Sequence, residues 1–528
     1  MMKKAIKKLL AALLAVAMVC AMAIPAFAYN PGETKEDLNT KHDYGAFQIF
    51  EGVISKDNET LSDVNWGQNI TEPDIFLANL KNDPTIGEKF ETAATAQDVL
   101  AVISKWHDSD DNSIAFARVV CHYLYPDANA NPTPVATDHT GGINIPKSGY
   151  YLIVDTSTFS DDDFYHAYNS FFLLNVPQTP YVVLVNHKVV KPTVEKEVYD
   201  NNDIGSTGGW GSSADHAINE PFQFRLIAKL PASENNGRAY DYYKEYAVCF
   251  TDTLSDGITF DKLDTVEITN GDGSTSQVIN NYTLDPNNPQ SSFKLSIDDV
   301  KTCVPDLNKG ATITVTYTAH LNEKAYVNTV GGGTDNKNSV YLEYSNNPRI
   351  STSLDHTTTS EVCVYTYQLN NTKHQDSENG PVLEGAGFRL YSNEACNAED
   401  EIKLKMNDDG TYSRDFSTEG KGVEMLSNKD GQFNVKGLDA GTYYLKETTP
   451  PTGYSACANK EIVISATHDV NHVDLSGNLS TTIINKKAGG ITLPSTGGIG
   501  TTIFYVVGGG LMVAAIVLLV TKKRMENK

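Results

Sequence analysis

An uncharged apolar run of about 20 residues near the C-terminus most constrains the fold, because it is long enough to cross a bilayer as a helix. The run covers residues 499–520, and the basic residues at 522–524 behind it fit the positive-inside rule. At the other end, lysines precede a shorter apolar stretch and the small-residue cleavage site Ala26-Phe27-Ala28. This arrangement predicts a signal peptide over residues 1–28. The folded part is therefore expected to begin at Tyr29 and to end before the C-terminal run.

The length and charge of the chain limit its organisation and its partners. Its 528 residues leave room for about three domains. The net charge is −24, and the charge becomes more negative once the two basic ends are set aside. This charge argues against nucleic acid and anionic membrane surfaces as partners.

Alternating apolar and polar residues between turn formers predict a mainly β chain of tandem immunoglobulin-like β-sandwich domains. The expected blocks are 29–186, 187–350 and 361–487, followed by a C-terminal segment at 488–528 that contains a flexible tether, the apolar run and the basic tail. The strands that we expect most clearly are 47–50, 149–155, 170–176, 181–185, 193–199, 222–229, 246–252, 311–321, 339–344, 362–369, 387–391, 441–447, 461–464 and 480–485.

A few helices are expected in the first block only. Thr95 and Asp98 have the spacing of a capping box, and apolar residues recur behind them at helical spacing. A second helical pattern runs from Asp111 to about Leu124.

Strand alternation brings three polar side chains toward the core of the second block. Lys196 shares a strand face with Val194 and Val198, and Asp252 shares one with Phe250. Asn338 shares a face with the apolar residues of the strand predicted at 339–344. Asn336, two positions earlier, points to the same face. Burial would lower the pKa of the amine and raise that of the acid, so the neutral lysine could attack the Asn338 amide carbon while Asp252 polarises its oxygen. A buried ion pair with a hydrogen-bonded asparagine is the alternative.

The pentapeptide Leu493-Pro494-Ser495-Thr496-Gly497 resembles the sortase sorting signal Leu-Pro-x-Thr-Gly. The order of motif, apolar run and basic tail strengthens this resemblance. It implies that a sortase cuts between Thr496 and Gly497 and joins the threonine carbonyl to an amine.

The second block resembles the middle domain of Gram-positive sortase-assembled backbone pilins of the SpaA type. The motifs that carry this resemblance are Lys191-Pro192-Thr193-Val194-Glu195-Lys196-Glu197-Val198, Asp252-Thr253-Leu254-Ser255-Asp256-Gly257 and 338–348. The resemblance implies an intramolecular isopeptide bond between Lys196 and Asn338, assisted by Asp252.

The third block resembles a collagen-adhesin B-type domain, through Leu383-Glu384-Gly385-Ala386-Gly387-Phe388-Arg389-Leu390 and the stretch 443–454. The resemblance implies a second bond, between Lys373 and Asn485, with Glu447 as the assisting acid. Both bonds would join the first strand of a domain to its last, so that pulling force passes through covalent bonds.

The lysine that accepts the next subunit is harder to assign. Backbone pilins carry a motif like Tyr-Pro-Lys-Asn, whereas this chain has Val185-Asn186-His187-Lys188-Val189. The position of Lys188, eight residues before Lys196, is close to the family spacing. Lys188 is therefore the expected acceptor, with Lys191 as the alternative.

Three further expectations concern cysteines, metals and catalysis. Six cysteines remain after the signal peptide, and we expect either a disulfide between Cys396 and Cys457 or free thiols. No metal site or cofactor is expected, since 108–119 begins like a calcium loop but lacks its glycine and its final glutamate. No cluster of a turnover enzyme is recognised.

Together these features predict the backbone subunit of a covalent pilus, secreted and anchored to the Gram-positive cell wall. The partners implied by the resemblance are pilin-type and cell-wall sortases, other copies of the chain, minor pilins and peptidoglycan. A singly anchored adhesin or accessory pilin is the alternative, because it would need no acceptor lysine. The altered sequence around Lys188 keeps this alternative open.

Overall fold

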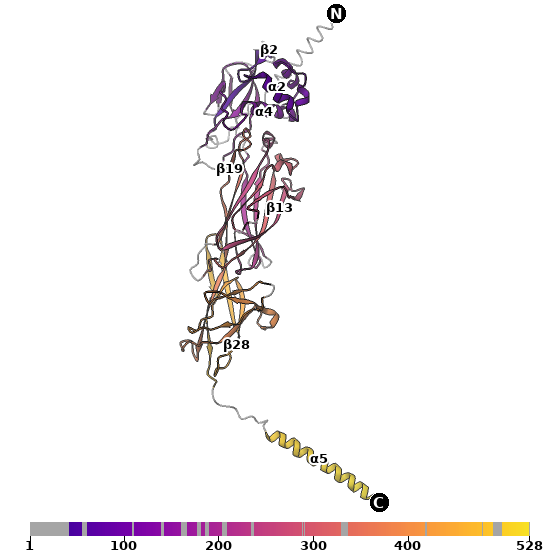
Figure 1. The fold of residues 1–528 in the computed structure, drawn as a ribbon, viewed down its shortest axis with the longest axis vertical. Coiled ribbons are helices and arrows are strands. Elements are labelled where there is room, and N and C mark those ends of the chain that lie inside the picture. The colour runs from indigo at the N-terminus through magenta and orange to yellow at the C-terminus, as the bar shows by residue number, and fades with distance from the viewer. Residues whose placement is uncertain are drawn as a thin grey trace, which may run out of the picture.

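The computed structural model describes residues 42–526, apart from 55–60, 108–109, 139–141, 160–165, 177–180, 185–189, 203–207, 234–236, 288, 290, 329–335, 418–419, 478 and 489–498. Three β-rich blocks follow one another along the long axis of the molecule (Figure 1). The sequence-based prediction of a mainly β chain of tandem sandwiches is therefore confirmed. The predicted signal peptide lies outside the described residues.

The N-terminal block contains a mixed set of strands and the helices predicted for it. Its main sheet has the order β2-β1-β5-β6, with β3 paired to β1, and β4 pairs with β7 separately. The strands are β1 (Tyr44–Ile54), β2 (Leu61–Trp66), β3 (Ala136–Asp138), β4 (Gly142–Ile145), β5 (Gly149–Asp155), β6 (Phe172–Val176) and β7 (Tyr181–Leu184). The helices are α2 (Pro73–Asn82), the 3-10 turn η1 (Gly87–Phe90), α3 (Ala96–Ile103) and α4 (Asp111–Leu124).

Alternation along β5 explains how this block is layered. Leu152 and Val154 pack into the core that contains the helices, whereas Tyr151 and Ile153 pack into the core with β4 and β7. Successive strand residues point to opposite faces, so one sheet separates the two cores. The capping box at Thr95 and Asp98 is present at the start of α3, as predicted.

The middle block is a sandwich of two sheets. One sheet has the order β14-β13-β17-β11-β8-β9, and the other β10-β20-β18-β12-β16-β15, with β19 paired to β18. The strands of the first sheet are β8 (Thr193–Asp200), β9 (Gly209–Gly211), β11 (Pro221–Leu230), β13 (Ile258–Asn270), β14 (Ser276–Val278) and β17 (Ala311–Leu321). Those of the second are β10 (Ser213–Asp215), β12 (Val248–Leu254), β15 (Thr283–Asp285), β16 (Phe293–Ile297), β18 (Lys337–Ser345), β19 (Leu354–His356) and β20 (Ser360–Tyr365). Its short 3-10 turns are η3 (Ala239–Tyr242), η4 (Val300–Thr302) and η5 (Leu307–Lys309).

Strand β17 shows why the sandwich forms. Its residues alternate without exception between buried and partly exposed positions, and the buried ones include Val315 and Tyr317. The buried side chains of both sheets form one continuous core. This pattern is typical of a sheet with one face packed against a second sheet.

The C-terminal block is a smaller sandwich. Its sheets have the orders β24-β25-β27-β21-β31 and β23-β22-β28-β29-β30, with β26 paired to β22. The first sheet contains β21 (Tyr367–Gln375), β24 (Leu404–Met406), β25 (Tyr412–Arg414), β27 (Val435–Leu438) and β31 (Ser480–Asn485). The second contains β22 (Gly387–Tyr391), β23 (Glu401–Ile402), β26 (Met425–Leu426), β28 (Gly441–Thr449), β29 (Lys460–His468) and β30 (Val473–Gly477), with the 3-10 turn η6 (Ala398–Asp400) beside them.

The chain passes from the middle to the C-terminal block through a single buried residue. The stretch predicted as one strand over 362–369 is divided at Thr366 into β20 and β21, which belong to different sheets. Thr366 is fully buried, and its hydroxyl donates to the carbonyl of Leu438 at 3.2 Å. The two sandwiches are therefore joined closely, without a polar linker.

Cation–π contacts join the N-terminal and middle blocks. The guanidinium of Arg349 lies 5.0 Å from the ring of Tyr125 and 4.9 Å from that of Tyr168. The backbone N–H of Tyr168 donates to the carbonyl of Asn346 at 2.8 Å.

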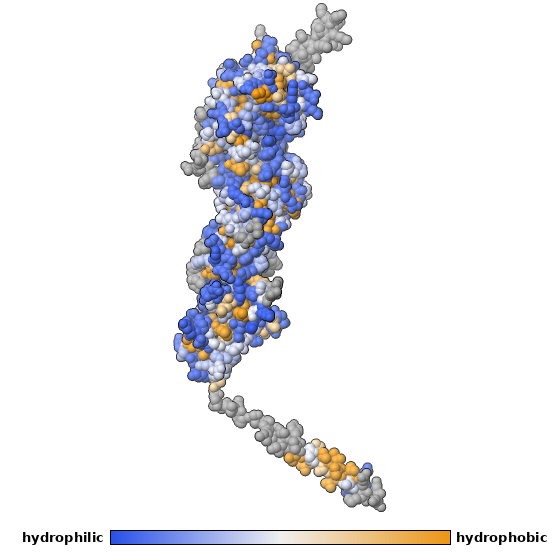
Figure 2. Space-filling model, in the orientation of Figure 1, coloured by the Kyte–Doolittle hydropathy of each residue, from blue (hydrophilic) through white to orange (hydrophobic). Residues whose placement is uncertain are grey.

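The last helix is α5 (Ile499–Glu526), which covers the apolar run of the sequence. Hydrophobic residues are exposed along it, whereas the face of the sandwiches in view is mostly hydrophilic (Figure 2). Among the described residues, no helix has the length and apolarity needed to cross a membrane.

Candidate functional site

The structure brings Lys196, Asp252 and Asn338 together inside the middle sandwich. Lys196 comes from β8 in one sheet, while Asp252 and Asn338 come from the neighbouring strands β12 and β18 in the other. In the register of these strands Asp252 lies opposite Val340 and Leu254 lies opposite Asn338, so the acid and the amide share the inward face. Strands β19 and β20 follow β18 in the same sheet. Asn338 therefore does not lie on the last strand, and the expected link from the first strand to the last is wrong for this sandwich.

A hydroxyl group connects the three side chains. The amine of Lys196 donates to Asp252 Oδ2 in a short contact, and it lies 3.1 Å from the hydroxyl of Tyr317. This hydroxyl donates to Asp252 Oδ1 at 3.2 Å and accepts from Asn338 Nδ2 at 2.6 Å. The carbonyl oxygen Oδ1 of Asn338 is buried and has no hydrogen-bond partner among the described residues.

The surroundings of this cluster disfavour charge. The side chains of Lys196 and Asp252 are 0 % exposed. Burial lowers the pKa of Lys196 to about 8 and raises the pKa of Asp252 above its ordinary value. A neutral amine and a protonated acid are therefore much closer to balance with the ion pair here than they are in water.

Tyr317 was missed by the sequence analysis. It lies on β17, where an inward tyrosine in an alternating strand is indistinguishable from ordinary core. Its ring packs against Phe224, Phe260 and Phe293. Only the fold shows that its hydroxyl lies between the two sheets at the lysine.

Asn336, the alternative partner, is engaged elsewhere. Its Oδ1 accepts from the backbone N–H of Tyr326 at 2.7 Å, and its Nδ2 donates to the carbonyl of the same residue at 2.7 Å. The Asn336 amide therefore pairs with the backbone of Tyr326 in the way a neighbouring strand would.

A second cluster of the same composition lies in the C-terminal sandwich. The amine of Lys373 donates to Asn485 Oδ1 in a short contact and lies 3.3 Å from Glu447 Oε1. The same carboxylate oxygen accepts from Asn485 Nδ2 at 2.7 Å, and Glu447 Oε2 accepts from the backbone N–H of Cys457 at 2.8 Å. Lys373 and Asn485 lie on the parallel neighbours β21 and β31, in which Lys373 is opposite Ile483.

This second cluster is also shielded from water. The side chains of Lys373 and Glu447 are 0 % exposed, and the amine lies 5.3 Å from the ring of Phe388. Burial lowers the pKa of Lys373. The acid contacts the amide directly here, whereas in the middle sandwich Tyr317 lies between the acid and the amide.

Of the residues expected to join subunits, the structure describes only Lys191. Lys188 and the sorting signal from Leu493 to Gly497 lie outside the described residues. Lys191 lies just before β8, is partly buried, and has its pKa lowered by this burial.

The disulfide between Cys396 and Cys457 is not formed, and both residues are free thiols. The sulfur of Cys396 accepts from Asn459 Nδ2 at 3.4 Å, and the backbone of Cys457 is held by Glu447. Burial beside Glu447 raises the pKa of Cys457 to about 11. The two thiols are thus engaged in different local contacts.

Two families match the C-terminal part of the chain. Residues 369–478 match the SpaA family, described as a prealbumin-like fold domain. Residues 485–527 match the family described as the LPXTG cell wall anchor motif. Comparison with curated proteins found no match.

Three of the solved structures that this fold matches are pilus proteins. The group B streptococcus pilus 2b backbone protein is 24% identical, with a TM-score of 0.39, and the match covers 52% of this chain and 96% of that one. The full-length major pilin SpaD from Corynebacterium diphtheriae is 18% identical, with a TM-score of 0.41, and the match covers 85% and 93%. The full-length major pilin RrgB from Streptococcus pneumoniae is 15% identical, with a TM-score of 0.40, and the match covers 85% and 93%.

The fold and the two family matches together define a class of protein. The chain consists of successive β-rich blocks, the last of which matches the SpaA prealbumin-like fold domain, and a match to the LPXTG cell wall anchor motif follows it. It is a cell-wall-anchored surface protein.

Proposed function

We propose that this chain is the backbone subunit of a covalently polymerised pilus. The observation that carries the proposal is a combination: a cell wall anchor motif follows two successive sandwiches, each with a buried lysine, acid and asparagine in its core. The anchor motif supports attachment by a sortase. The buried clusters suit a stalk that must withstand pulling force, so the role is structural and involves no turnover of substrate.

In each sandwich the lysine forms an isopeptide bond with the asparagine. The neutral amine of Lys373 attacks Cγ of Asn485, a C–N bond forms, and the original amide nitrogen leaves as ammonia. Glu447 contacts both nitrogens, so it can take the proton from the attacking amine and deliver a proton to the leaving one. The reaction occurs once per chain and requires no cofactor.

The middle sandwich uses an additional group. Lys196 attacks Cγ of Asn338, and the leaving nitrogen lies 2.6 Å from the Tyr317 hydroxyl. This hydroxyl also contacts Asp252, so it connects the acid to the leaving group. The pKa shifts caused by burial, downward for Lys196 and upward for Asp252, favour the neutral amine and the protonated acid that this chemistry requires.

Subunits are joined through Thr496 and Lys188. A pilin-type sortase cleaves after Thr496, holds its carbonyl as a thioester, and transfers it to the amine of Lys188 on another copy. A cell-wall sortase joins the last subunit to peptidoglycan, and minor pilins share the same route. Lys191 is the alternative acceptor, although its partial burial makes its amine less accessible to an enzyme.

Co-expression with a pilin-type sortase tests this function. Boiled samples should form a ladder on SDS gels, and Lys188→Ala should abolish this ladder while Lys191→Ala leaves it intact. Persistence of the ladder in Lys188→Ala and its loss in Lys191→Ala would transfer the acceptor role to Lys191. Absence of any ladder, with a sortase that polymerises another pilin in the same cells, would favour a singly anchored adhesin or accessory pilin.

A further inference from the structure

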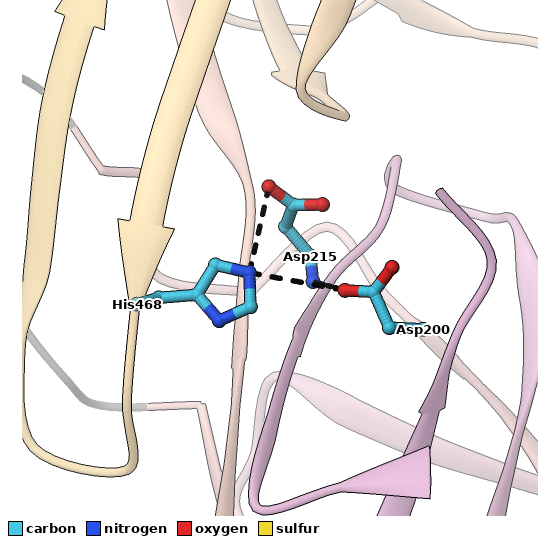
Figure 3. A group of neighbouring side chains, drawn as sticks. All are labelled: Asp200, Asp215 and His468. Atoms are coloured by element: carbon cyan, nitrogen blue, oxygen red, sulfur yellow. Dashed lines mark hydrogen bonds and ion pairs between the residues drawn. The ribbon is translucent and has the colours of Figure 1, made fainter. Parts of the chain in front are cut away.

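Three side chains with metal-binding atoms meet where the middle and C-terminal sandwiches join. Asp200 ends β8 and Asp215 ends β10 in the middle block, and His468 ends β29 in the C-terminal block (Figure 3). Nε2 of His468 lies 3.8 Å from Asp200 Oδ2 and 3.9 Å from Asp215 Oδ2. All three ligand atoms lie within 4.8 Å of one another.

The Asp215 carboxylate lacks the compensation that a buried charge requires. Asp215 is 0 % exposed, and among the described residues no amine, amide, hydroxyl or backbone N–H donates to its carboxylate oxygens; only the Asp439 carboxyl lies within hydrogen-bond reach. Figure 3 shows the Asp215 and Asp200 carboxylates both approaching the same nitrogen of the His468 ring. A buried carboxylate without partners is costly, so the site requires a cation or a proton.

Further carboxyl groups lie beside these three residues. Asp439 is buried and lies next to Asp215. Glu220 also lies nearby, and Arg414 approaches it at 3.7 Å. The site therefore contains more carboxyl groups than cationic side chains.

Ser213 orients the histidine ring for binding a cation. The Ser213 hydroxyl donates to the carbonyl of His468 at 3.3 Å, so its oxygen is available to accept from Nδ1–H, which lies at 2.9 Å. A proton on Nδ1 leaves the lone pair of Nε2 directed toward the two aspartates. Metal-binding histidines are commonly held in this way, with the other ring nitrogen donating to a neighbouring group.

We propose that Asp200, Asp215 and His468 bind one divalent transition-metal ion that joins the middle and C-terminal sandwiches. An imidazole together with carboxylates suits Zn²⁺ or Mn²⁺, whereas Ca²⁺ takes about 6–8 oxygen ligands. Metal–ligand distances of about 2.0–2.2 Å in a tetrahedral site place ligand atoms roughly 3.4 Å apart. The two distances from His468 Nε2, 3.8 and 3.9 Å, exceed this separation by about half an ångström, and the two carboxylate oxygens lie within 4.8 Å of each other.

The ion would stiffen the junction between the middle and C-terminal sandwiches, which already contains direct contacts. The backbone N–H of Ile218 in the middle block donates to the carbonyl of Gly437 in the C-terminal block at 3.0 Å. The metal would add bonds from two strand ends of the middle block to the hairpin that follows β29. Bending of one sandwich against the other would then require breaking a metal–ligand bond.

No metal site was predicted from the sequence, in which these three residues do not form a local motif. Ser213 and His468, which contact each other at this site, lie 255 positions apart in the chain. Only the docking of the two sandwiches brings the ligands together.

Zinc titration of the full chain tests the proposal. The chain, purified in detergent and stripped with EDTA, would be titrated with Zn²⁺ in a calorimeter. We expect one tight Zn²⁺ per chain and at least tenfold weaker binding in Asp215→Asn and in His468→Gln. The matched control is the double variant His472→Gln/Asp474→Asn, which alters an exposed pair on the same hairpin, 2.9 Å apart, and should bind like the wild type.

Three outcomes would overturn the proposal: no Zn²⁺ binding, equal binding in the site and control variants, or tighter binding of Ca²⁺ than of Zn²⁺. A proton shared by Asp215 and Asp439 would produce the first of these outcomes. If a site variant does not fold, X-ray absorption of zinc bound to the wild-type chain decides the question. One imidazole with oxygen ligands supports the site, and thiolate or several imidazole ligands would contradict it.

Discussion

The amine of Lys373 donates directly to the side-chain oxygen of Asn485 inside the C-terminal sandwich, although 112 positions separate the two residues. Attack by this amine on the adjacent amide carbon requires little movement, and Glu447 contacts both side chains. The three side chains are therefore arranged for formation of an isopeptide bond.

Each sandwich should lose one ammonia, about 17 Da, so the intact chain should be lighter than its sequence by two such losses. In Asn338→Ala and in Asn485→Ala, one loss should disappear relative to the mass of each variant's own sequence. Intact mass spectrometry measures both effects. Asn336→Ala is the control and should keep both losses, because its amide is bonded to Tyr326. A wild-type chain with the full sequence mass would contradict both bonds.

Tyr317→Phe should slow bond formation in the middle sandwich only. The substitution keeps the ring but removes the hydroxyl that contacts Lys196, Asp252 and Asn338. Chains sampled soon after synthesis should contain the C-terminal mass loss but not the middle one.

Tyr240→Phe provides the control for this experiment. It removes a buried hydroxyl of the same sandwich that bonds to the carbonyl of Pro231 at 2.9 Å and has no role in the cluster. Equal rates of mass loss in the two variants would exclude a role for the Tyr317 hydroxyl.

Without its bond, the middle sandwich should become more stable as the pH rises from about 8 toward 10.5. In Asn338→Ala, Lys196 keeps a folded pKa near 8, below the unfolded value of 10.5, so unfolding takes up a proton within this window. The free energy of unfolding should therefore increase with pH, by an amount of order 3 kcal/mol at most. Denaturant unfolding at several pH values measures it. The double variant Lys196→Met/Asn338→Ala should lack this increase, and an equal increase in both would contradict the assignment.

Gly437→Ala should weaken the joint between the two sandwiches. Gly437 has φ +72°, and a Cβ there would lie 2.5 Å from the side chain of Ile218 in the middle block. The clash and the strained backbone together should cost about 1–3 kcal/mol. Calorimetric unfolding measures the change.

Gly453→Ala is the matched control for the joint, since its φ is +86° and no atom lies within 4 Å of the added carbon. The Gly453→Ala substitution therefore introduces backbone strain without a side-chain clash. Equal destabilisation by the two substitutions would mean that packing against Ile218 contributes nothing.

The lysine, acid and asparagine clusters could be predicted from the sequence, whereas the contacts between the middle and C-terminal sandwiches could not. Alternation alone placed Lys196, Asp252 and Asn338 on inward faces, because side chains of a strand alternate strictly. Tyr317 escaped notice because an inward aromatic residue is the ordinary content of a core. The division at Thr366 was missed because both halves of the stretch are equally apolar, and only pairing with different sheets separates them.

The site of Asp200, Asp215 and His468 could not have been predicted, because it depends on how two domains dock. Spacing rules detect ligands that one local segment supplies, and here each ligand ends a different strand. The contacts of a joint follow from the complementary shapes of two folded bodies, which no single segment of the sequence encodes.

The most direct test of the account is the chemical link between subunits. Polymer formed with a pilin-type sortase would be digested with a protease and analysed by tandem mass spectrometry. We predict a branched peptide in which the carbonyl of Thr496 is bonded to the side-chain nitrogen of Lys188. Finding Thr496 joined only to peptidoglycan fragments, with no branch to any lysine of a second copy, would contradict a backbone pilin.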